Sequence, residues 1–197
     1  MHKTLWLAVC ALAGLLIAAA PVFPATKAGD AEVSAAGSIS TSDIGTQFGT
    51  STTDSTSIQV SGGYFTTPNI QIGGSYNTDE STDTTPGEPS TTSVFTALSG
   101  FLKYHFNPDS EVVAYAGVQA GTANIEITAS GVSVSGSAFA NGFMGGLKFF
   151  VSEDVSANVE YNVLNTTISI STPFGTFDAD VRDAGFLFGL SLYFSVQ

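Results

Sequence analysis

Residues that commonly carry out catalysis are scarce in this chain, and they form no recognisable set. The chain has two histidines, and His105 is the one that lies outside the N-terminal segment. Hydrolysis by a serine, histidine and acid set needs a serine and an acid aimed at that histidine. No motif specifies such a serine. The sequence therefore predicts no catalytic residue, and we expect that the protein is not an enzyme.

Metal and cofactor sites have little support in the sequence. Asp178 and Asp180 could supply half of a calcium site, but no further ligand follows them at a suitable spacing. The chain contains no zinc pattern, haem motif or glycine-rich phosphate loop. We therefore expect neither a metal nor a cofactor.

The N-terminal segment has the pattern of a secretory signal peptide. Lys3 supplies the positive charge, and residues 5–20 form an apolar run rich in Leu and Ala. Cleavage is expected between residues 19 and 31. A cut after Ala28 would leave a signal peptide, residues 1–28, and one domain, residues 29–197; the alternative is an uncleaved anchor helix. Cys10 lies inside the apolar run, so we expect no lipidation and no disulfide.

Composition restricts the partners and the mode of membrane contact. Hydrophobic residues make up 43% of the chain, charged residues only 11%, and the net charge is −12. Such an acidic protein cannot neutralise phosphates, so nucleic acid is not an expected partner. After residue 23 no apolar run is long enough to cross a bilayer as a helix. A chain can be this hydrophobic without such a run if it forms strands in which only one face is apolar.

Period-two alternation is clearest at the C-terminus, in residues 183–197. One face of that strand is fully apolar, with Phe186, Phe188, Leu190, Leu192 and Phe194, and the other face is mostly small. Similar alternation predicts strands near residues 33–39, 58–64, 70–76, 93–106, 112–120, 139–151 and 155–163. The expected fold is therefore all-β, an eight-stranded antiparallel up-and-down transmembrane barrel.

The expected connections alternate in length. Loops rich in Ser, Thr, Asp and Gly are expected at residues 41–57, 77–92, 121–137 and 165–183, and short turns near Pro68, Pro108 and Glu153. Outer-membrane barrels have short turns on the periplasmic side and long loops outside. Aromatic residues gather beside the short turns and predict an interfacial girdle: Tyr64, Phe65, Tyr104, Phe106, Phe149, Phe150, Tyr193 and Phe194.

Polar residues on the opposite face of the strands are expected to fill the lumen as a structural network: Lys103, His105, Glu111, Lys148, Asn158 and Glu160. Eight strands enclose just enough space for side chains, and lone buried charges are costly. The network should therefore block a continuous channel. A short turn at residues 152–154 puts Lys148 opposite Asn158 and one diagonal step from Glu160. We expect a Lys148–Glu160 ion pair, extended by Lys103.

Several fragments resemble the small eight-stranded outer-membrane barrels of the OmpA-like transmembrane-domain and OmpX type. They are GGYFTTPNIQIGGSY (62–76), FLKYHF (101–106), VVAYAGVQAG (112–121), NGFMGGLKFF (141–150) and NVEYNVL (158–164). In the last strand, Gly189, Leu192 and Phe194 resemble the closing-strand assembly signal of this family. The resemblance implies a monomer in the Gram-negative outer membrane, with periplasmic termini and lipid contacts. It also implies handling by periplasmic chaperones and the barrel-insertion machinery.

The resemblance leaves the role open. One class is a structural or interaction barrel that serves envelope integrity or adhesion through four acidic extracellular loops and an unknown surface partner. The other class is a narrow pore or a small-ligand-binding barrel. A third possibility is a soluble lipocalin-like carrier, in which the valine face of residues 155–163 would point inward.

Overall fold

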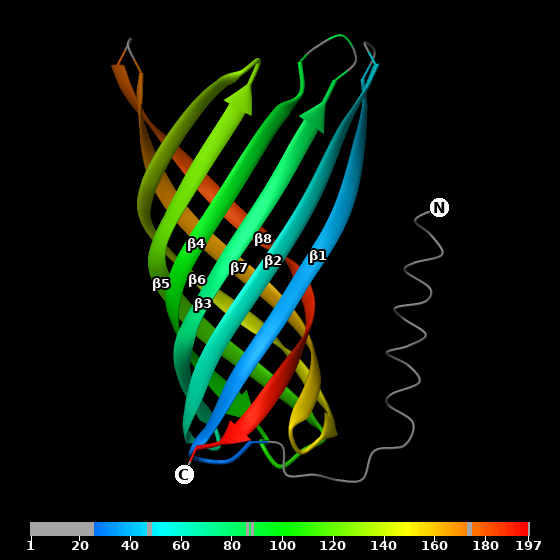
Figure 1. Cartoon of the computed structure of the whole chain (residues 1–197), viewed down its shortest axis with the longest axis vertical. Helices are drawn as coiled ribbons and strands as arrows, with labels where there is room; N and C mark the ends of the chain where they lie inside the picture. The colour runs from blue at the N-terminus through cyan, green and yellow to red at the C-terminus, as the bar shows by residue number, and fades with distance from the viewer. Residues whose placement is uncertain (1–25, 47–48, 86, 88, 173–174, 197) are drawn as a thin grey trace.

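Eight strands form one closed antiparallel barrel, in chain order (Figure 1). The computed structural model describes residues 26–46, 49–85, 87, 89–172 and 175–196. The strands are β1 (Asp30–Thr46), β2 (Gly49–Thr67), β3 (Ile70–Thr84), β4 (Thr91–Phe106), β5 (Val112–Ala129), β6 (Val132–Ser152), β7 (Val155–Thr172) and β8 (Gly175–Ser195). The all-β, up-and-down prediction is confirmed.

Short turns connect the strands at one end of the barrel, which we call the short-turn end. β2 and β3 are joined by Pro68 and Asn69, and β6 and β7 by Glu153 and Asp154. The turn between β4 and β5 contains Asn107 with a left-handed φ of 50°, a conformation that Asn tolerates well. These are the three positions where the sequence predicted short turns.

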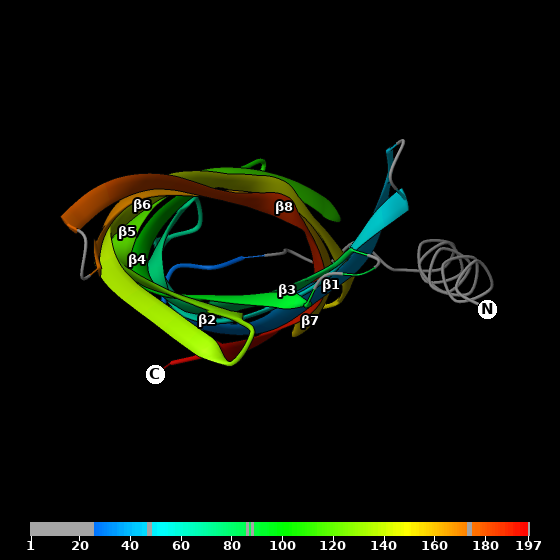
Figure 2. The ribbon, with the colours of Figure 1, turned by 90° about the horizontal axis from the view of Figure 1, so that it is seen from above.

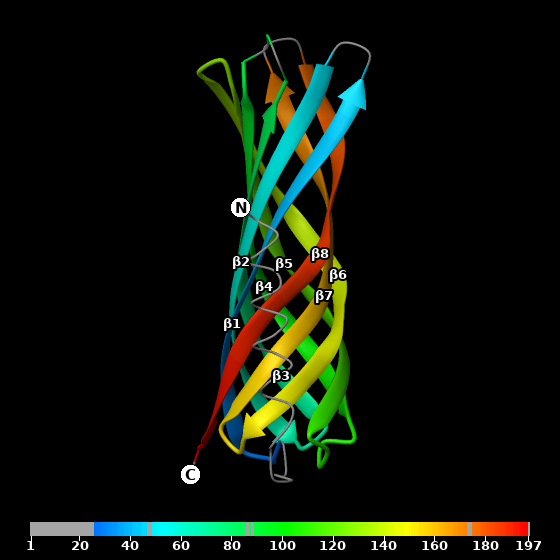
Figure 3. The same ribbon diagram turned by 90° about the vertical axis from the view of Figure 1, so that its right-hand side faces the viewer.

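The four segments expected to be long loops are instead mostly strand. Figures 1 and 3 show the strands continuing as paired ribbons to the opposite end, which we call the hairpin end. The strands contain 15 to 21 residues, whereas about 9–11 residues suffice to cross a membrane. The β5–β6 connection is a tight turn in which Ser130 and Gly131 both have positive φ, as a two-residue hairpin requires.

The physical reason for these extensions is cross-strand pairing between hydroxyl side chains. Ser55 bonds to Ser81 at 3.3 Å, and the hydroxyls of Thr128 and Ser133 lie 2.7 Å apart. Thr also has a high strand propensity, and directly opposed Thr and Ser residues stabilise a sheet. A segment can therefore be too polar to resemble a buried strand and still form a regular ladder.

The outward face carries an apolar belt. Large apolar residues on every strand are exposed there, among them Val60, Tyr76, Leu98, Val118, Phe143 and Phe186. The polar face of β7, with Ser156, Asn158, Glu160 and Asn162, is buried inside the barrel. The soluble-carrier alternative is therefore wrong, because it needs the opposite orientation of the two faces.

A separate observation concerns helices. Among the described residues, no helix has the length and apolar character needed to span a membrane.

The aromatic girdle is only partly as expected. Tyr64, Tyr104, Phe106 and Phe194 are exposed on the outer surface. Phe65, Phe150 and Tyr193 point inward and are buried together with Val113. Adjacent aromatic residues on a strand necessarily face opposite sides, so in the pairs Tyr64–Phe65 and Tyr193–Phe194 only one member faces lipid.

Strand β1 closes the barrel against β8 along a short junction, which we call the seam. Its pairs run from Asp30↔Ser195 to Gly37↔Phe188, whereas β1 pairs with β2 as far as Thr46↔Gly49. Seen from above in Figure 2, the outer part of the β1–β2 hairpin leans away from the ring. Between the described residues of β1 and β8, no pair is formed beyond Gly37.

Candidate functional site

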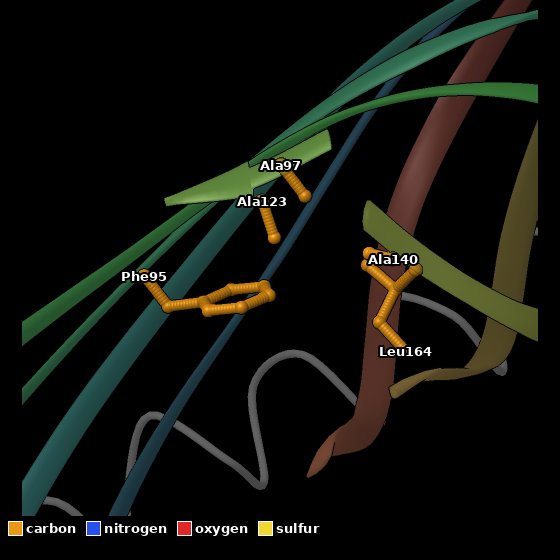
Figure 4. Close-up of a cluster of buried hydrophobic side chains, with 5 residues drawn as sticks. All are labelled: Phe95, Ala97, Ala123, Ala140 and Leu164. Carbon is orange, nitrogen blue, oxygen red and sulfur yellow. The ribbon is translucent and has the colours of Figure 1, made fainter. Parts of the chain in front are cut away.

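Inward side chains fill the barrel in layers. Phe65, Val113, Phe150 and Tyr193 form an apolar layer near the short-turn end. A second apolar cluster contains Phe95, Ala97, Ala123, Ala140 and Leu164. In Figure 4, Phe95, Ala97 and Ala123 lie on one side of this cluster and Ala140 and Leu164 on the other. Buried charged and amide side chains lie elsewhere in the lumen and form a connected network.

One centre of the network is the ion pair between Lys148 on β6 and Glu32 on β1. Glu32 also accepts hydrogen bonds from Gln71 Nε2 at 2.7 Å and from Ser191 Oγ at 2.6 Å. The ammonium of Lys148 lies 5.4 Å from the ring centres of Tyr115 and Tyr193, where aromatic faces attract a cation. Both charges are thus compensated although Lys148 is only 1% exposed.

The second centre is the ion pair between Lys103 on β4 and Glu160 on β7, with 3.0 Å between Nζ and Oε2. Tyr115 Oη donates to the same carboxylate at 2.7 Å, and Gln59 Nε2 donates at 3.0 Å. Tyr115 has room to reach inward because Gly146 is its neighbour on β6. A Cβ at Gly146 would lie 2.8 Å from Tyr115 Oη.

Amide side chains extend this network across the lumen. Asn162 Nδ2 donates to Gln59 Oε1 at 3.0 Å, and Gln119 donates to Asn162 Oδ1. Gln59 therefore links Glu160 to Asn162, and strands β2, β5 and β7 are tied together through the barrel interior. The paired and bonded groups leave no need for water to solvate the two carboxylates.

The predicted network residues fall into two groups. Lys103, Lys148, Asn158 and Glu160 are buried inside the barrel, and Lys148 pairs with Asn158 in the strand register as expected. The expected Lys148–Glu160 ion pair is wrong, because each residue has another partner. Lys148 and Glu160 are diagonal neighbours on one sheet face, so the spacing of the strands permitted an ion pair between them. Glu32 instead approaches Lys148 from across the lumen, and the spacing of neighbouring strands does not reveal such a contact.

Two predicted members behave differently from expectation. Glu111 lies in the turn before β5, is half-buried, and contributes its carbonyl to Phe150 N at 2.9 Å. Its carboxylate forms no hydrogen bond or ion pair with the described lumenal residues, and it lies in the turn just before β5 begins at Val112. His105 is fully buried and packs its ring against Phe65 and Tyr115. Neither of its ring nitrogens finds a hydrogen-bond partner among the described residues.

Sequence reasoning missed Glu32 and the lumenal residues Gln59, Gln71, Tyr115, Gln119 and Ser191. Glu32 was missed because the first strand was expected to start at Val33, whereas β1 begins at Asp30. Strand parity could have found the others, since each shares a face with a buried polar residue. The closing-strand residues Gly189, Leu192 and Phe194 lie in β8, where Leu192 pairs with Val33 and Phe194 with Ala31 across the seam.

Above the network, a cavity of about 320 Å³ opens towards the hairpin end. Asp79 on β3 and Asp183 on β8 line it, together with Asn77 and Ser57. Both acids lie beyond the apolar belt, whose outward residues end at Tyr76 on β3 and Phe186 on β8. Burial, followed by the Asp79 charge, raises the pKa of Asp183 to about 6. Burial also raises the pKa of Asp79, although the Ser57 hydroxyl donates to it.

Comparison with solved structures shows the same fold. Neisserial surface protein A is 17% identical with a TM-score of 0.57, covering 85% of this chain and 98% of that one. OprG of Pseudomonas aeruginosa is 15% identical with a TM-score of 0.56, covering 88% and 100%. Ail of Yersinia pestis is 13% identical with a TM-score of 0.54, covering 85% and 99%.

No curated protein matches the chain. The family model for the outer membrane protein beta-barrel domain matches residues 9–194. The chain therefore belongs to this family, and it is an integral protein of the Gram-negative outer membrane with both mature termini in the periplasm.

Proposed function

We propose that this protein is a closed, non-conducting and non-enzymatic barrel whose function lies in the strand extensions on the cell surface. Its role would be structural or adhesive, in envelope integrity or in contact with a surface partner. The observation that carries this proposal is the filled lumen. Two buried ion pairs occupy the space through which a solute would have to pass, and Tyr115 lies between them, donating to Glu160 with its ring centre 5.4 Å from Lys148 Nζ.

The lumen supports a scaffold better than it supports a pore. Glu32 and Glu160 each receive at least three hydrogen bonds from side chains on other strands. Opening a channel would break these bonds and leave buried charges unpaired, at a cost of several kcal/mol. The apolar layer of Phe65, Val113, Phe150 and Tyr193 adds a second barrier on the periplasmic side.

The surface extensions supply the interaction area. With short turns in the periplasm, the hairpin end faces the medium. Asp54, Glu80, Glu126 and Asp180 are carried by these extensions, so the exposed surface is acidic and rich in hydroxyls. Ail, a structural neighbour, has been solved in complex with a heparin analogue. An acidic surface disfavours such a polyanion and favours a neutral or cationic partner.

Assembly would follow the usual route of outer-membrane barrels. We propose that periplasmic chaperones and the insertion machinery handle the chain, that β8 carries the recognition signal, and that the mature protein is a monomer surrounded by outer-membrane lipids. The pairing of β1 with β8 supports a self-contained barrel, because it closes the sheet along all but the last outward belt residue of β8, Phe186.

The first test separates a scaffold from a pore. Purified protein reconstituted in planar bilayers should give no steady conductance, and vesicles that contain it should retain a small encapsulated dye. A parallel preparation with a known porin serves as the positive control. Steady open conductance at the level of that control would refute the proposal and favour the narrow-pore alternative.

The second test asks whether the extensions carry the function. Removing residues 124–129 and 132–137 while keeping the Ser130-Gly131 turn would join the hairpin at Ala123↔Ala138, a pair already present in the register. A second variant, Asp54→Asn with Asp180→Asn, keeps full length and shows whether the acidic charge or the length of the extensions matters. We expect normal insertion of both proteins. Shortening should reduce surface adhesion or outer-membrane resistance to detergent. If behaviour stays unchanged here and after the other three hairpins are shortened in the same way, the extensions have no such role.

A further inference from the structure

The cavity at the hairpin end brings two carboxylates together. Asp79 and Asp183 come from β3 and β8, which are not neighbours in the barrel, yet both line this one cavity. Two ionised carboxylates that share one cavity repel each other, and a positive charge between them removes the repulsion. Either a proton or a cation can supply that charge.

The basic residues near the two acids form no ion pair with them. Arg182 borders the same cavity, but alternation turns its side chain towards the outer face, where it is exposed. Lys103 is engaged by Glu160 deeper in the lumen, and Lys148 by Glu32. Among the described residues, no ion pair involves Asp79 or Asp183. Neither acid is therefore held in an ion pair with a described basic side chain.

A third oxygen ligand is available beside the acids. Asn77 lies two residues before Asp79 on the same face of β3 and lines the same cavity. It is only 5% exposed, and its Oδ1 has no hydrogen-bond partner. A buried amide oxygen without a donor is costly, and its position in this cavity points to a ligand that accepts electron pairs.

From this geometry we propose that Asp79, Asp183 and Asn77 form a calcium site at the extracellular mouth of the lumen, with Ser57 Oγ as a fourth oxygen. Ca²⁺ prefers carboxylate, amide and hydroxyl oxygens, and it accepts irregular geometries with water completing the shell. The cavity volume of about 320 Å³ leaves space for those waters. No cluster of three or more His, Cys, Asp or Glu side chains occurs among the described residues, so an amide and a hydroxyl must complete the set.

Such a site would join distant parts of the wall. Asp79 lies opposite Ser57 in the β2–β3 pairing, while Asp183 belongs to β8, beyond the end of the seam at Phe188. A cation held by both would connect β8 to β2 and β3 where β1 and β8 are no longer paired. The site goes beyond the scaffold proposal and does not depend on it, because a conducting barrel could carry the same ligands.

The test measures Ca²⁺ binding by the protein purified from outer membranes, using isothermal titration with Ca²⁺ and, separately, Mg²⁺. We expect a dissociation constant on the order of 10⁻⁴–10⁻³ M for Ca²⁺. Asp183→Asn should weaken binding about tenfold or more, since a charged ligand is lost. This variant should fold normally, because an amide can donate to Asp79. Asn77→Leu should also weaken binding.

The matched control is Asp180→Asn, which removes an exposed outward carboxylate from the same strand. Its Ca²⁺ affinity should stay within about twofold of wild type. Equal weakening by Asp180→Asn and Asp183→Asn would overturn the proposal, because general surface charge would then explain the binding. The absence of Ca²⁺ binding by wild type up to about 10 mM would also overturn it, given the affinity range of extracellular sites, and would leave a shared proton between the two acids.

Discussion

Replacing Glu32 with alanine should be among the most damaging single changes in the barrel. The substitution removes the partner of Lys148, whose ammonium is buried among Phe65, Tyr115 and Tyr193. It also removes the acceptor for Gln71 and Ser191. Aromatic faces attract the stranded cation only weakly, by about 0.5–2 kcal/mol. We expect a loss of stability on the order of 3–5 kcal/mol, the usual cost of leaving one charge of a buried pair uncompensated.

The double variant Glu32→Leu and Lys148→Met separates charge from packing. It removes both charges and keeps most of the volume, so the unpaired cation disappears. Two neutral donors, on Gln71 and Ser191, would still lack their acceptor. A residual cost of about 1–3 kcal/mol is therefore expected. The double variant should be more stable than Glu32→Ala alone, although it carries more substitutions.

The measurement is reversible urea unfolding from phospholipid vesicles, followed by far-ultraviolet circular dichroism. Glu126→Ala is the control, because Glu126 is exposed on the outer face of β5; its effect should stay within about 0.5 kcal/mol. If Glu32→Ala unfolds like wild type, the lumen is hydrated and the argument from burial is wrong. If the double variant is as unstable as the single one, charge is not the main cause.

Three further predictions concern assembly and pH. Boiled and unboiled samples should migrate differently on gels, because β1 and β8 close the sheet into a hydrogen-bonded barrel that unfolds only on heating; identical migration would count against closure. Phe194→Ala, or removal of residues 192–197, should prevent insertion, since Leu192 and Phe194 pair with β1 at the seam; normal surface display of the truncated chain would contradict this. Finally, the pKa of Asp183, raised to about 6 from 3.8, means that the folded state holds this proton more tightly than the unfolded chain. Its protonation therefore favours the fold at low pH, and the benefit is lost as pH rises towards 6. Without Ca²⁺, Asp183→Asn should exceed wild type in stability at about pH 7.5 by on the order of 1–3 kcal/mol, and the gap should shrink at about pH 4.5. A gap independent of pH in urea unfolding would refute the shift.

The fold could be predicted because strand alternation is a local property. The faces of β4, β7 and β8 are visible in the sequence itself, and turns at Pro68 and Glu153 fix the register of the hairpins. The strand extensions were mistaken for loops because Ser and Thr ladders lack an apolar face. Their stability comes from pairs such as Ser55–Ser81, which become visible only when two strands are aligned.

The lumenal network could be predicted in membership but not in pairing. Alternation along each strand identifies which side chains point inward, so the sequence predicted Lys103, Lys148 and Glu160 to be lumenal. It does not say which residues meet across the lumen, because that depends on barrel closure and shear. Lys148 and Glu32 are 116 residues apart in the chain. The cavity acids Asp79 and Asp183 meet for the same reason, and no local motif relates them.

The seam has a consequence for the lifetime of the barrel. Its eight residue pairs join the two ends of the domain, with Asp30 and Ser195 separated by 165 positions. Loop closure of that length is entropically costly and slow, so the seam should be the last contact to form during folding. Under load it should be the first to part, beginning at Gly37 and running towards the periplasm. Inside the barrel, Ser191 donates a hydrogen bond to Glu32 across the seam. The ion network therefore holds β1 and β8 together and should slow the separation of these strands, with which unfolding from the membrane begins.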